Sequence, residues 1–205
     1  MEIKILNTAS NLFLSLGFKS VTMDDLANEM GISKKTIYKY FSNKEDLVDA
    51  TTNYVHTQIS ETICEITTRG LNAISENFAI KIAFKDIFKK SKTSPMFQLK
   101  KYYPKTYEKL IDNEFGIFKE CIGNNIENGI EEGLYKKDLK KDVVLKFYFM
   151  LVFGLHDNNI FNLEDYDLNE LDINALEYHT RAIATHKGIL ELEKELNKIT
   201  MYINK

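Results

Sequence analysis

The sequence has few of the residues that secreted or membrane-spanning proteins commonly contain. Its 205 residues include two cysteines, two prolines and no tryptophan. Cys64 and Cys121 fit no metal-ligand spacing, so we expect reduced, buried thiols, with a redox pair as the alternative. No apolar run reaches the ~18 residues of a membrane helix, and Glu2 and Lys4 interrupt any apolar start. We therefore expect a cytoplasmic protein with no membrane partner.

Motifs for catalysis and metal binding are also missing. The four histidines lie at positions 56, 156, 179 and 186, and none joins a cysteine or acidic cluster with ligand spacing. His179 and His186 are seven residues apart, about two helical turns, which is too far to share one ion. No Gly-rich phosphate loop and no nucleophile motif occurs. We expect no catalytic residue, no metal site and no cofactor, and hence not an enzyme.

Charge and hydropathy leave a folded helical protein. Charged residues make up 28% and hydrophobic residues 44% of the chain, so a disordered protein is excluded. A net charge of −3 excludes a wholly basic nucleic-acid coat protein but leaves room for a local basic patch. Apolar residues recur at helical spacing almost throughout, and no alternating strand pattern with hairpin signals occurs. The pattern predicts an all-α fold.

Four short helical signals open the chain. The first follows apolar spacings of three and four and stops at Gly17. The second begins at Thr22, where Asp25 completes a capping box, and stops at Gly31. The third begins at the N-cap Ser33 and runs to about residue 41, and the fourth begins at residue 42 with a second capping box to Glu45. Short helices do not persist alone in water, so the first three should form one helix-turn-helix bundle.

The fourth helix is long and leads without interruption to about residue 68. Further helices are predicted at about 71–92, 96–102, 105–134, 139–157, 170–185 and 187–203. The last one carries a seam of apolar residues at spacings of three and four, which indicates core packing or a dimer contact.

Positive charge is concentrated on the third helix. Four lysines and no acid lie between residues 33 and 44, although the first 50 residues contain six lysines and seven acids. At 100° per residue, Ile37 and Phe41 define the inward face and Tyr40 flanks it, whereas Lys35, Tyr38 and Lys39 lie opposite. One interpretation is that these lysines only form the solvent-exposed face of a short helix. The preceding capped helix and glycine turn favour a probe for the major groove of DNA instead.

These residues carry a family resemblance. Gly17-Phe18, Val21–Ala27, Gly31–Phe41 and Asn43–Leu47 together resemble the N-terminal signature of the TetR family of bacterial transcriptional regulators. The resemblance implies operator contacts from Thr22, Lys34, Lys35, Thr36, Tyr38, Lys39, Tyr40 and Lys44. Lys44 is then a phosphate clamp, and base readout falls to Lys35 and Lys39. Many family members carry several basic residues before the first helix, but only Lys4 is available here, which argues against a minor-groove arm.

The resemblance also implies what the rest of the chain does. It implies a helix-turn-helix domain at 1–46 and a larger helical domain at 47–205 for ligand binding and dimerisation. The dimer is expected from 139–157 and 170–185, including Phe149, Val152 and Phe153, and the segment 143–155 is apolar on all sides. The effector pocket is expected to use the aromatic residues Phe88, Tyr103, Tyr107 and Phe118, for which ordinary core packing is the alternative.

Two charge blocks stand apart from these motifs. The segment 81–109 carries nine lysines and two acids, and the segment 157–177 carries seven acids and no base. They are either solvated faces, some of them paired with each other, or the basic block attracts an anionic ligand.

The predicted function is a homodimeric regulator that binds double-stranded operator DNA and acts as a repressor released by an unidentified small-molecule effector. An activator or a ligand-independent regulator is the alternative on the same fold. A helical protein-interaction module, whose basic helix meets an acidic partner, is the alternative from a different class.

Overall fold

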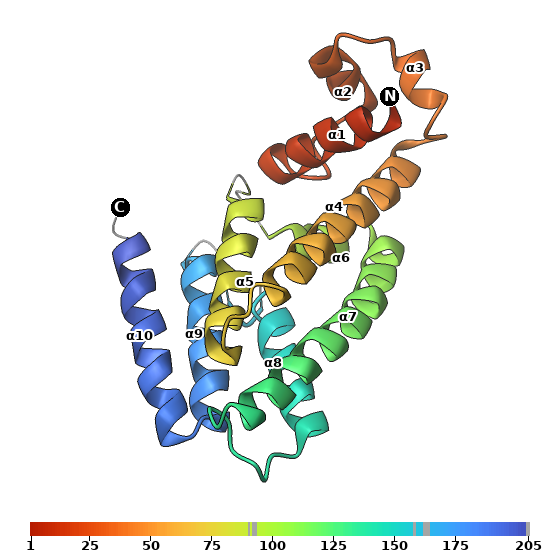
Figure 1. The fold of residues 1–205 in the computed structure, drawn as a ribbon. Helices are drawn as coiled ribbons and strands as arrows, with labels where there is room; N and C mark the ends of the chain where they lie inside the picture. The colour runs from red at the N-terminus through yellow and green to blue at the C-terminus, as the bar shows by residue number, and fades with distance from the viewer. Residues whose placement is uncertain (90, 92–93, 158, 162–164, 204–205) are drawn as a thin grey trace. The chain divides into compact units, whose positions relative to one another are not determined.

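The chain folds into helices. The computed structural model describes residues 1–89, 91, 94–157, 159–161 and 165–203, and within these ranges ten helices and no strand occur (Figure 1). The all-α prediction is confirmed. The helices are α1 (Glu2–Leu16), α2 (Met23–Met30), α3 (Lys34–Tyr38), α4 (Lys44–Thr67), α5 (Ala73–Phe88), α6 (Pro95–Tyr102), α7 (Pro104–Glu131), α8 (Lys141–Gly154), α9 (Leu168–Ile183) and α10 (His186–Ile203).

The ends of α1 and α2 follow the predicted signals. The backbone of α1 ends at Gly17, whose φ of 88° favours glycine. In α2, the Thr22 hydroxyl accepts a hydrogen bond from the backbone N–H of Asp25, and the Asp25 carboxylate accepts one from the backbone N–H of Thr22. Gly31 then closes α2 in the left-handed conformation, with a φ of 63°. The capping box and both glycine stops are confirmed.

The third and fourth helices differ from the prediction at their shared boundary. Helix α3 ends at Tyr38, not near residue 41, because the backbone N–H of Tyr40 donates to Ile37 three residues back and the chain tightens there. Helix α4 begins at Lys44 and not at residue 42. Its cap is Asn43, whose side-chain oxygen accepts a hydrogen bond of 2.9 Å from the backbone N–H of Asp46.

The later helices lie close to their predicted ranges. The prolines Pro95 and Pro104 are the first residues of α6 and α7, where a missing N–H costs no helical hydrogen bond. Helix α5 ends at Phe88, and residues 90 and 92 of the predicted range 71–92 lie outside the described residues. In α10, Leu192 and Ile199 are buried in a core, so the apolar seam serves packing within the chain, while the side chain of residue 203 is not described.

The helices form two compact units. The first unit comprises residues 1–61 and 87–114, and the second comprises residues 62–86 and 115–205. The predicted domain boundary at residue 46 stays a prediction. In the first unit, α2 packs against both α1 and α3. Its core gathers the buried residues Ile5, Ala9, Phe13, Phe18, Val21, Met23, Leu26, Ala27, Ile37, Phe41, Leu47, Val48, Leu99 and Leu110.

Two polar contacts tie α6 and α7 to the N-terminal helices of the first unit. The side-chain oxygen of Gln98 on α6 accepts a hydrogen bond of 2.8 Å from the backbone N–H of Phe18, just after α1. On α4, the Asp49 carboxylate accepts hydrogen bonds from Thr106 and Lys109, both in the first turns of α7. The start of α4 is therefore fixed to the start of α7.

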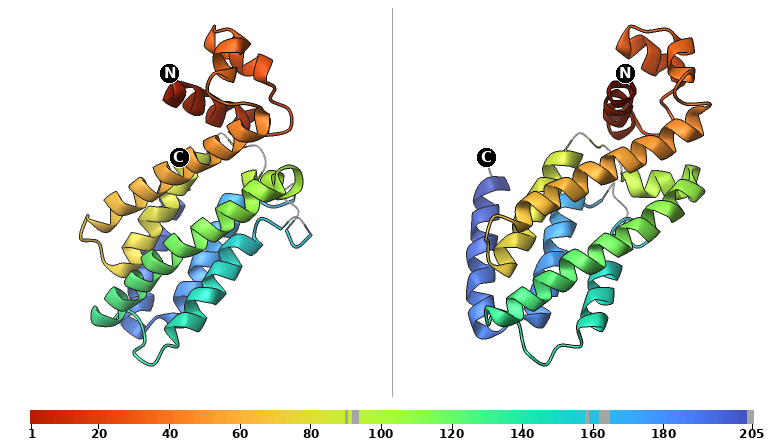
Figure 2. Two further views of the ribbon diagram at one scale, coloured as in Figure 1. Left: turned by 90° about the vertical axis from the view of Figure 1, so that its right-hand side faces the viewer. Right: turned by 45° about the vertical axis from the view of Figure 1, so that its right-hand side comes forward.

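The second unit is built around α9, which packs against both α8 and α10 (Figure 2). A buried polar network lies beside its apolar core. Asn125 on α7 donates to the Ala73 carbonyl and to the Glu76 carboxylate, and its own oxygen accepts from Asn77. Since buried polar groups need partners, this network specifies the register of α5 against α7.

Ionisable side chains are also buried in the second unit. Lys81 on α5 forms an ion pair of 2.5 Å with Asp172 on α9, so the two charge blocks of the sequence are paired at this point. The His179 ring stacks on the Tyr148 ring with centroids 3.9 Å apart. Burial lowers the pKa of His179 to about 4, and burial likewise lowers the pKa of His156 to about 4.

The cysteines only partly meet expectation. Cys64 is exposed and Cys121 is half-buried, so the prediction of two buried thiols is wrong for Cys64. Cys64 lies five residues after the buried Ile59, which turns it about 140° away on α4.

The described part of the chain has neither a helix suited to span a membrane nor a candidate metal cluster. No helix there is long and apolar enough to cross a bilayer. No group of three or more histidine, cysteine, aspartate or glutamate side chains there could hold a metal ion.

We predict that His179→Gln reduces the pH dependence of stability. His179 is neutral in the folded chain down to about pH 4, whereas in the unfolded chain it takes up a proton below its ordinary pKa of 6.5. Stability from this group is therefore complete above pH 6.5 and falls as the pH drops towards 4. Between about pH 7 and pH 5, the wild type should lose about 1–2 kcal/mol more than the variant.

The measurement is urea unfolding of both proteins at the two pH values. His156 remains in both and contributes equally, so only the difference between the pH-dependent losses is compared. An equal loss in the two proteins would contradict a neutral His179.

Candidate nucleic-acid interface

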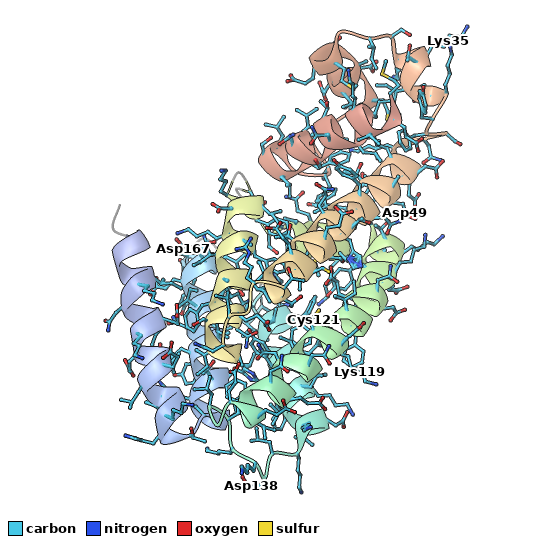
Figure 3. All side chains as sticks on the ribbon, in the orientation of Figure 1. Lys35, Asp49, Lys119, Cys121, Asp138 and Asp167 are labelled. Atoms are coloured by element: carbon cyan, nitrogen blue, oxygen red, sulfur yellow. The ribbon has the colours of Figure 1, made fainter. Side chains whose placement is uncertain are left out.

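Helix α3 presents a basic outer face over an apolar inner one. Ile37 is fully buried and holds the inner side of the helix against the core of the first unit. Lys35, Lys39 and Tyr38 are exposed on the outer side, and Tyr38 keeps 45% of its surface accessible. Figure 3 shows the Lys35 side chain extending away from the helices. The Ser33 cap fixes the start of α3, since its hydroxyl accepts from the backbone N–H of Thr36.

Tyr40 is more accessible than the helical wheel indicates. It keeps 43% of its surface exposed, nearly as much as Tyr38. The wheel assumes 100° per residue, but α3 ends at Tyr38 and the following turn rotates the side chains differently. Phe41, beyond that turn, is buried as expected.

Thr36 stands in a different environment from the lysines. Its hydroxyl lies 2.9 Å from the Ser33 hydroxyl, with which it shares a hydrogen bond, and it is only partly exposed. Thr36 therefore helps to cap α3, and its hydroxyl is already engaged before any phosphate approaches.

Lys34 is held by an acidic residue that the sequence pattern did not identify as its partner. Its ammonium forms an ion pair of 2.8 Å with Asp24 in the first turn of α2. The hydrogen bond that the Lys34 ammonium donates to the Asp24 carboxylate raises the pKa of Lys34. The same ammonium lies 6.0 Å from the centre of the Tyr38 ring. Asp24 therefore competes with any phosphate for Lys34.

Thr22 and Lys44 come together at the starts of α2 and α4. The Lys44 ammonium donates a hydrogen bond of 3.1 Å to the backbone carbonyl of Lys19, in the turn before α2. Burial lowers the pKa of Lys44, and the negative charge of Asp25 partly offsets that effect. Asp25 is also the hydrogen-bond partner of Thr22. Two predicted contacts that lie 22 residues apart in the sequence are thus brought to one surface.

This surface has the chemistry of a DNA-binding face. Ammonium groups attract phosphates without regard to sequence, and hydroxyl and backbone N–H groups hold phosphate oxygens in register. A five-residue helix is about 7.5 Å long, which fits within the major groove. Lysines on its outer side can then reach guanine edges.

The four predicted pocket residues fall in two different units. Tyr103 and Tyr107 pack against the core of the first unit. The partly buried Phe88 lies in the same unit. Phe118 belongs to the second unit, where its ring lies 5.4 Å from that of Tyr148. Tyr103, Tyr107 and Phe118 have the packing role given as the alternative, and the part of all four residues in ligand binding stays a prediction.

The predicted dimer residues are half-buried within the second unit. The Phe149 ring lies 5.3 Å from that of Phe118 and 4.2 Å from that of Phe153, and Val152 packs against the same core. The accessible side of α8 carries other residues instead. On α8, Phe147 is 63% and Met150 is 68% exposed, and Val143 and Leu151 are exposed as well, while on α9 Tyr178 is exposed.

The segment 143–155 is therefore not covered all round within one chain. Periodicity did not reveal which side stays open, because Lys146 is the only charged residue in an otherwise apolar segment. The side that faces α7 can be identified only from the packing of the aromatic rings.

The N-terminal part of the chain matches a known family. The sequence model described as "Bacterial regulatory proteins, tetR family" matches residues 5–51. The transcriptional regulator YhgD of Bacillus subtilis (strain 168) is 29% identical over 157 residues, which are 73% of this chain and 81% of YhgD. YuxN of the same organism is 36% identical over 66 residues, and this match spans 32% of this chain but only 23% of YuxN.

Solved structures share the fold over most of the chain. A TetR-family regulator from Agrobacterium tumefaciens has a TM-score of 0.71 and 15% identity over 90% of this chain and 97% of its own. SmeT, the repressor of a Stenotrophomonas maltophilia efflux pump, has a TM-score of 0.65 and 14% identity over 91% of each chain. A Saccharomonospora viridis regulator in complex with choline has a TM-score of 0.69 and 15% identity over 90% of this chain and 98% of its own. At these identities, the similarity concerns the fold alone.

We predict that Asp24→Asn strengthens binding to duplex DNA. The substitution releases Lys34 from its ion pair and removes a negative charge from the candidate interface. Because an exposed ion pair contributes about 0–1 kcal/mol, the affinity should rise about two- to fivefold. Fluorescence anisotropy with a labelled duplex measures the change.

The matched control is Glu29→Gln, which removes the same charge from an exposed position on α2. An equal gain in both variants would show a general charge effect and contradict competition by Asp24 for Lys34.

Proposed function

We propose that this chain, whose residues 5–51 match the tetR family of bacterial regulatory proteins, is a homodimeric repressor released from its operator by a small molecule. The observation that carries the proposal is α3, a helix whose lysines and Tyr38 face outward over a buried Ile37. Each copy reads a half-site in the major groove through this helix. No catalytic step is part of the proposed function.

The eight predicted contacts divide into two roles. Lys35 and Lys39, on the outer side of α3, read base edges. Thr22 and Lys44, at the starts of α2 and α4, hold phosphates and set the register of the helix, and Lys34, Thr36, Tyr38 and Tyr40 complete the phosphate-facing surface. A single helix-turn-helix unit reads only a short half-site, so two copies on a pseudopalindrome supply the specificity.

The open side of α8 supports the dimer. Phe147, Met150 and Leu151 expose apolar surface that an isolated chain would leave in water, and Tyr178 on α9 adds to it. In a dimer with a two-fold axis, the open side of α8 in one copy packs against the same side in the other copy, so both exposed surfaces become buried. We therefore propose these exposed residues as the central contacts of the dimer, with Phe149, Val152 and Phe153 supporting α8 from behind.

Release by an effector is part of the same proposal. The Saccharomonospora viridis regulator, which shares the fold, was solved in complex with choline, and this supports a small-molecule effector for the present chain. Here Phe88, Tyr103, Tyr107 and Phe118 are the proposed aromatic contacts. A ligand releases DNA only if it binds the DNA-incompetent state more tightly, and about 4 kcal/mol of preference changes the operator affinity about a thousandfold.

The decisive experiment for the function is footprinting on the DNA that flanks its own gene, with and without small-molecule fractions of a cell extract. A protected pseudopalindrome supports a regulator, and higher expression of a reporter in its absence supports a repressor. Lower expression would support the activator instead. A fraction that raises the unfolding temperature of the protein but leaves the footprint intact would contradict release.

The protein-interaction module predicts a different result. A basic helix that meets an acidic protein should bind duplex DNA weakly and without preference for any site, so salt-dependent binding without sequence preference would favour that alternative.

We predict that Lys39→Ala and Lys44→Ala have different effects on DNA recognition. Lys39→Ala should reduce the preference for one base pair by about 1–3 kcal/mol, because a base contact is lost. Lys44→Ala should weaken all sites alike and lower the salt slope by about one, because one phosphate contact is lost. Titrations of the footprinted site and of its single-base variants at several salt concentrations measure both effects. A sequence-selective loss in Lys44→Ala would contradict its role as a phosphate clamp.

We predict that Phe147→Glu dissociates the dimer. A charge placed in the centre of an apolar interface should cost about 3 kcal/mol or more, which weakens the dimer at least a hundredfold. Sedimentation equilibrium measures the association. Leu190→Glu is the matched control, since Leu190 is also exposed but lies on α10. A Phe147→Glu variant that remains as dimeric as the control would show that the open side of α8 is not the interface.

A further inference from the structure

A second basic surface lies next to Lys44 in the first unit, and it extends from the turn between α1 and α2 to α6, which is outside the helix-turn-helix domain. The Lys19 ammonium lies over the Tyr102 ring, 5.2 Å from its centre, and the Lys101 ammonium lies 5.4 Å from the centre of the same ring. Lys19 belongs to the turn between α1 and α2, whereas Tyr102 and Lys101 are the last residues of α6. We call Lys19, Lys101 and Tyr102 the Tyr102 patch.

The charge of the Tyr102 patch is not neutralised within the chain. In the described ranges, neither Lys19 nor Lys101 forms an ion pair with a carboxylate. All three residues of the patch are exposed, and the exposed Lys100 and Lys105 flank it in the sequence. A cation over an exposed aromatic ring gains only about 0.5–1 kcal/mol, so two ammonium groups that share one ring are available to an anion.

Two acidic groups on α4 leave this charge in place. The Asp49 carboxylate is already shared by Thr106 and Lys109 at the start of α7. Glu45 acts on Tyr103, whose pKa is raised mainly by burial and further by this charge. Glu45 therefore limits the patch on the side of α4 but does not pair with its lysines.

The patch continues the surface of the predicted phosphate clamp. The Lys44 ammonium donates to the backbone carbonyl of Lys19, and the Lys19 side chain then extends over Tyr102. Lys44, Lys19 and Lys101 thus follow one another along one surface of the first unit. Phosphates follow one another along a DNA strand every 3.4 Å of helix axis, so a row of cations suits a strand better than a single anion.

We propose that the Tyr102 patch binds backbone phosphates of the operator beyond those held by the helix-turn-helix. The proposal rests on the proposed DNA-binding function and extends it to α6. Part of the basic block at 81–109 thereby gains a function, whereas Lys81 and Lys109 of the same block are committed to ion pairs within the chain. The Tyr102 ring orders both lysine side chains, so less side-chain entropy is lost when the phosphates bind.

The partner is identified by its chemistry as duplex DNA. Contacts to phosphates position the protein and carry no sequence information, so the patch adds affinity and salt dependence but no base preference. It also lengthens the stretch of duplex that each copy needs.

The test compares the wild type with the double variant Lys19→Ala/Lys101→Ala on the operator obtained by selection from random duplexes. One duplex carries only the selected site, and a second extends it by flanking base pairs. The variant should bind the longer duplex about tenfold more weakly, with a salt slope lowered by about two, because two phosphate contacts are lost. Its preference for the operator over random duplex should be unchanged.

Two further variants serve as controls. Lys137→Ala/Lys140→Ala removes the same charge from exposed positions between α7 and α8, and it should keep the wild-type slope. Lys19→Arg/Lys101→Arg keeps the charge and should restore the slope and the benefit of the flanking base pairs. Circular dichroism of each variant, matched to the wild type, confirms that the helices are retained.

The outcomes separate this proposal from the function on which it rests. If the wild type selects an operator but the alanine variant keeps its slope and affinity, the Tyr102 patch does not bind DNA, although the regulatory function stands. A loss that is equal in the Lys137→Ala/Lys140→Ala control would also overturn the patch, because net charge alone would explain it. If the wild type selects no operator at all, both the function and the patch are overturned.

Discussion

The orientation of α3 depends on the burial of Ile37 and Phe41. A five-residue helix cannot persist alone in water, so its outer face is defined only while these two side chains remain in the core of the first unit. The caps on either side support the same arrangement, since Ser33 starts α3 and Asn43 starts α4. DNA recognition is therefore as stable as this small core, and the lysines contribute no stability to it.

In the candidate interface, carboxylate and carbonyl oxygens of the first unit compete with phosphates for the lysine ammonium groups. Lys34 is paired with Asp24, and Lys44 donates to a backbone carbonyl while Asp25 lies nearby. Such exposed contacts are weak, so phosphates can replace them at small cost, and until then they keep the lysine side chains in defined positions. Lys35 and Lys39, the proposed base readers, extend into solvent instead.

Local signals predicted the fold better than they predicted the sites. The capping box of Thr22 and Asp25 and the stop at Gly31 depend only on neighbouring residues, so the sequence alone sufficed for them. The capping box predicted for residue 42 and Glu45 was wrong, because the structure shows Asn43 as the cap of α4. The open side of α8 was hidden for another reason. Lys146 is the only charge in its segment 143–155, so the choice between Phe147 and Phe149 depends on which ring meets Phe118.

The contacts of α6 and α7 with the N-terminal helices have a consequence for where mutations that alter operator recognition should lie in the gene. Gln98 holds the backbone after α1, and Lys109 and Thr106 hold Asp49 near the start of α4. The segment from 95 to 110 is thus part of the scaffold that carries α3, although it lies about 60 residues further along the gene. A genetic screen for altered operator recognition should accordingly recover alleles in two separated clusters of codons. One cluster would lie in the N-terminal helices, and the other would lie in the segment from 95 to 110 that supports them.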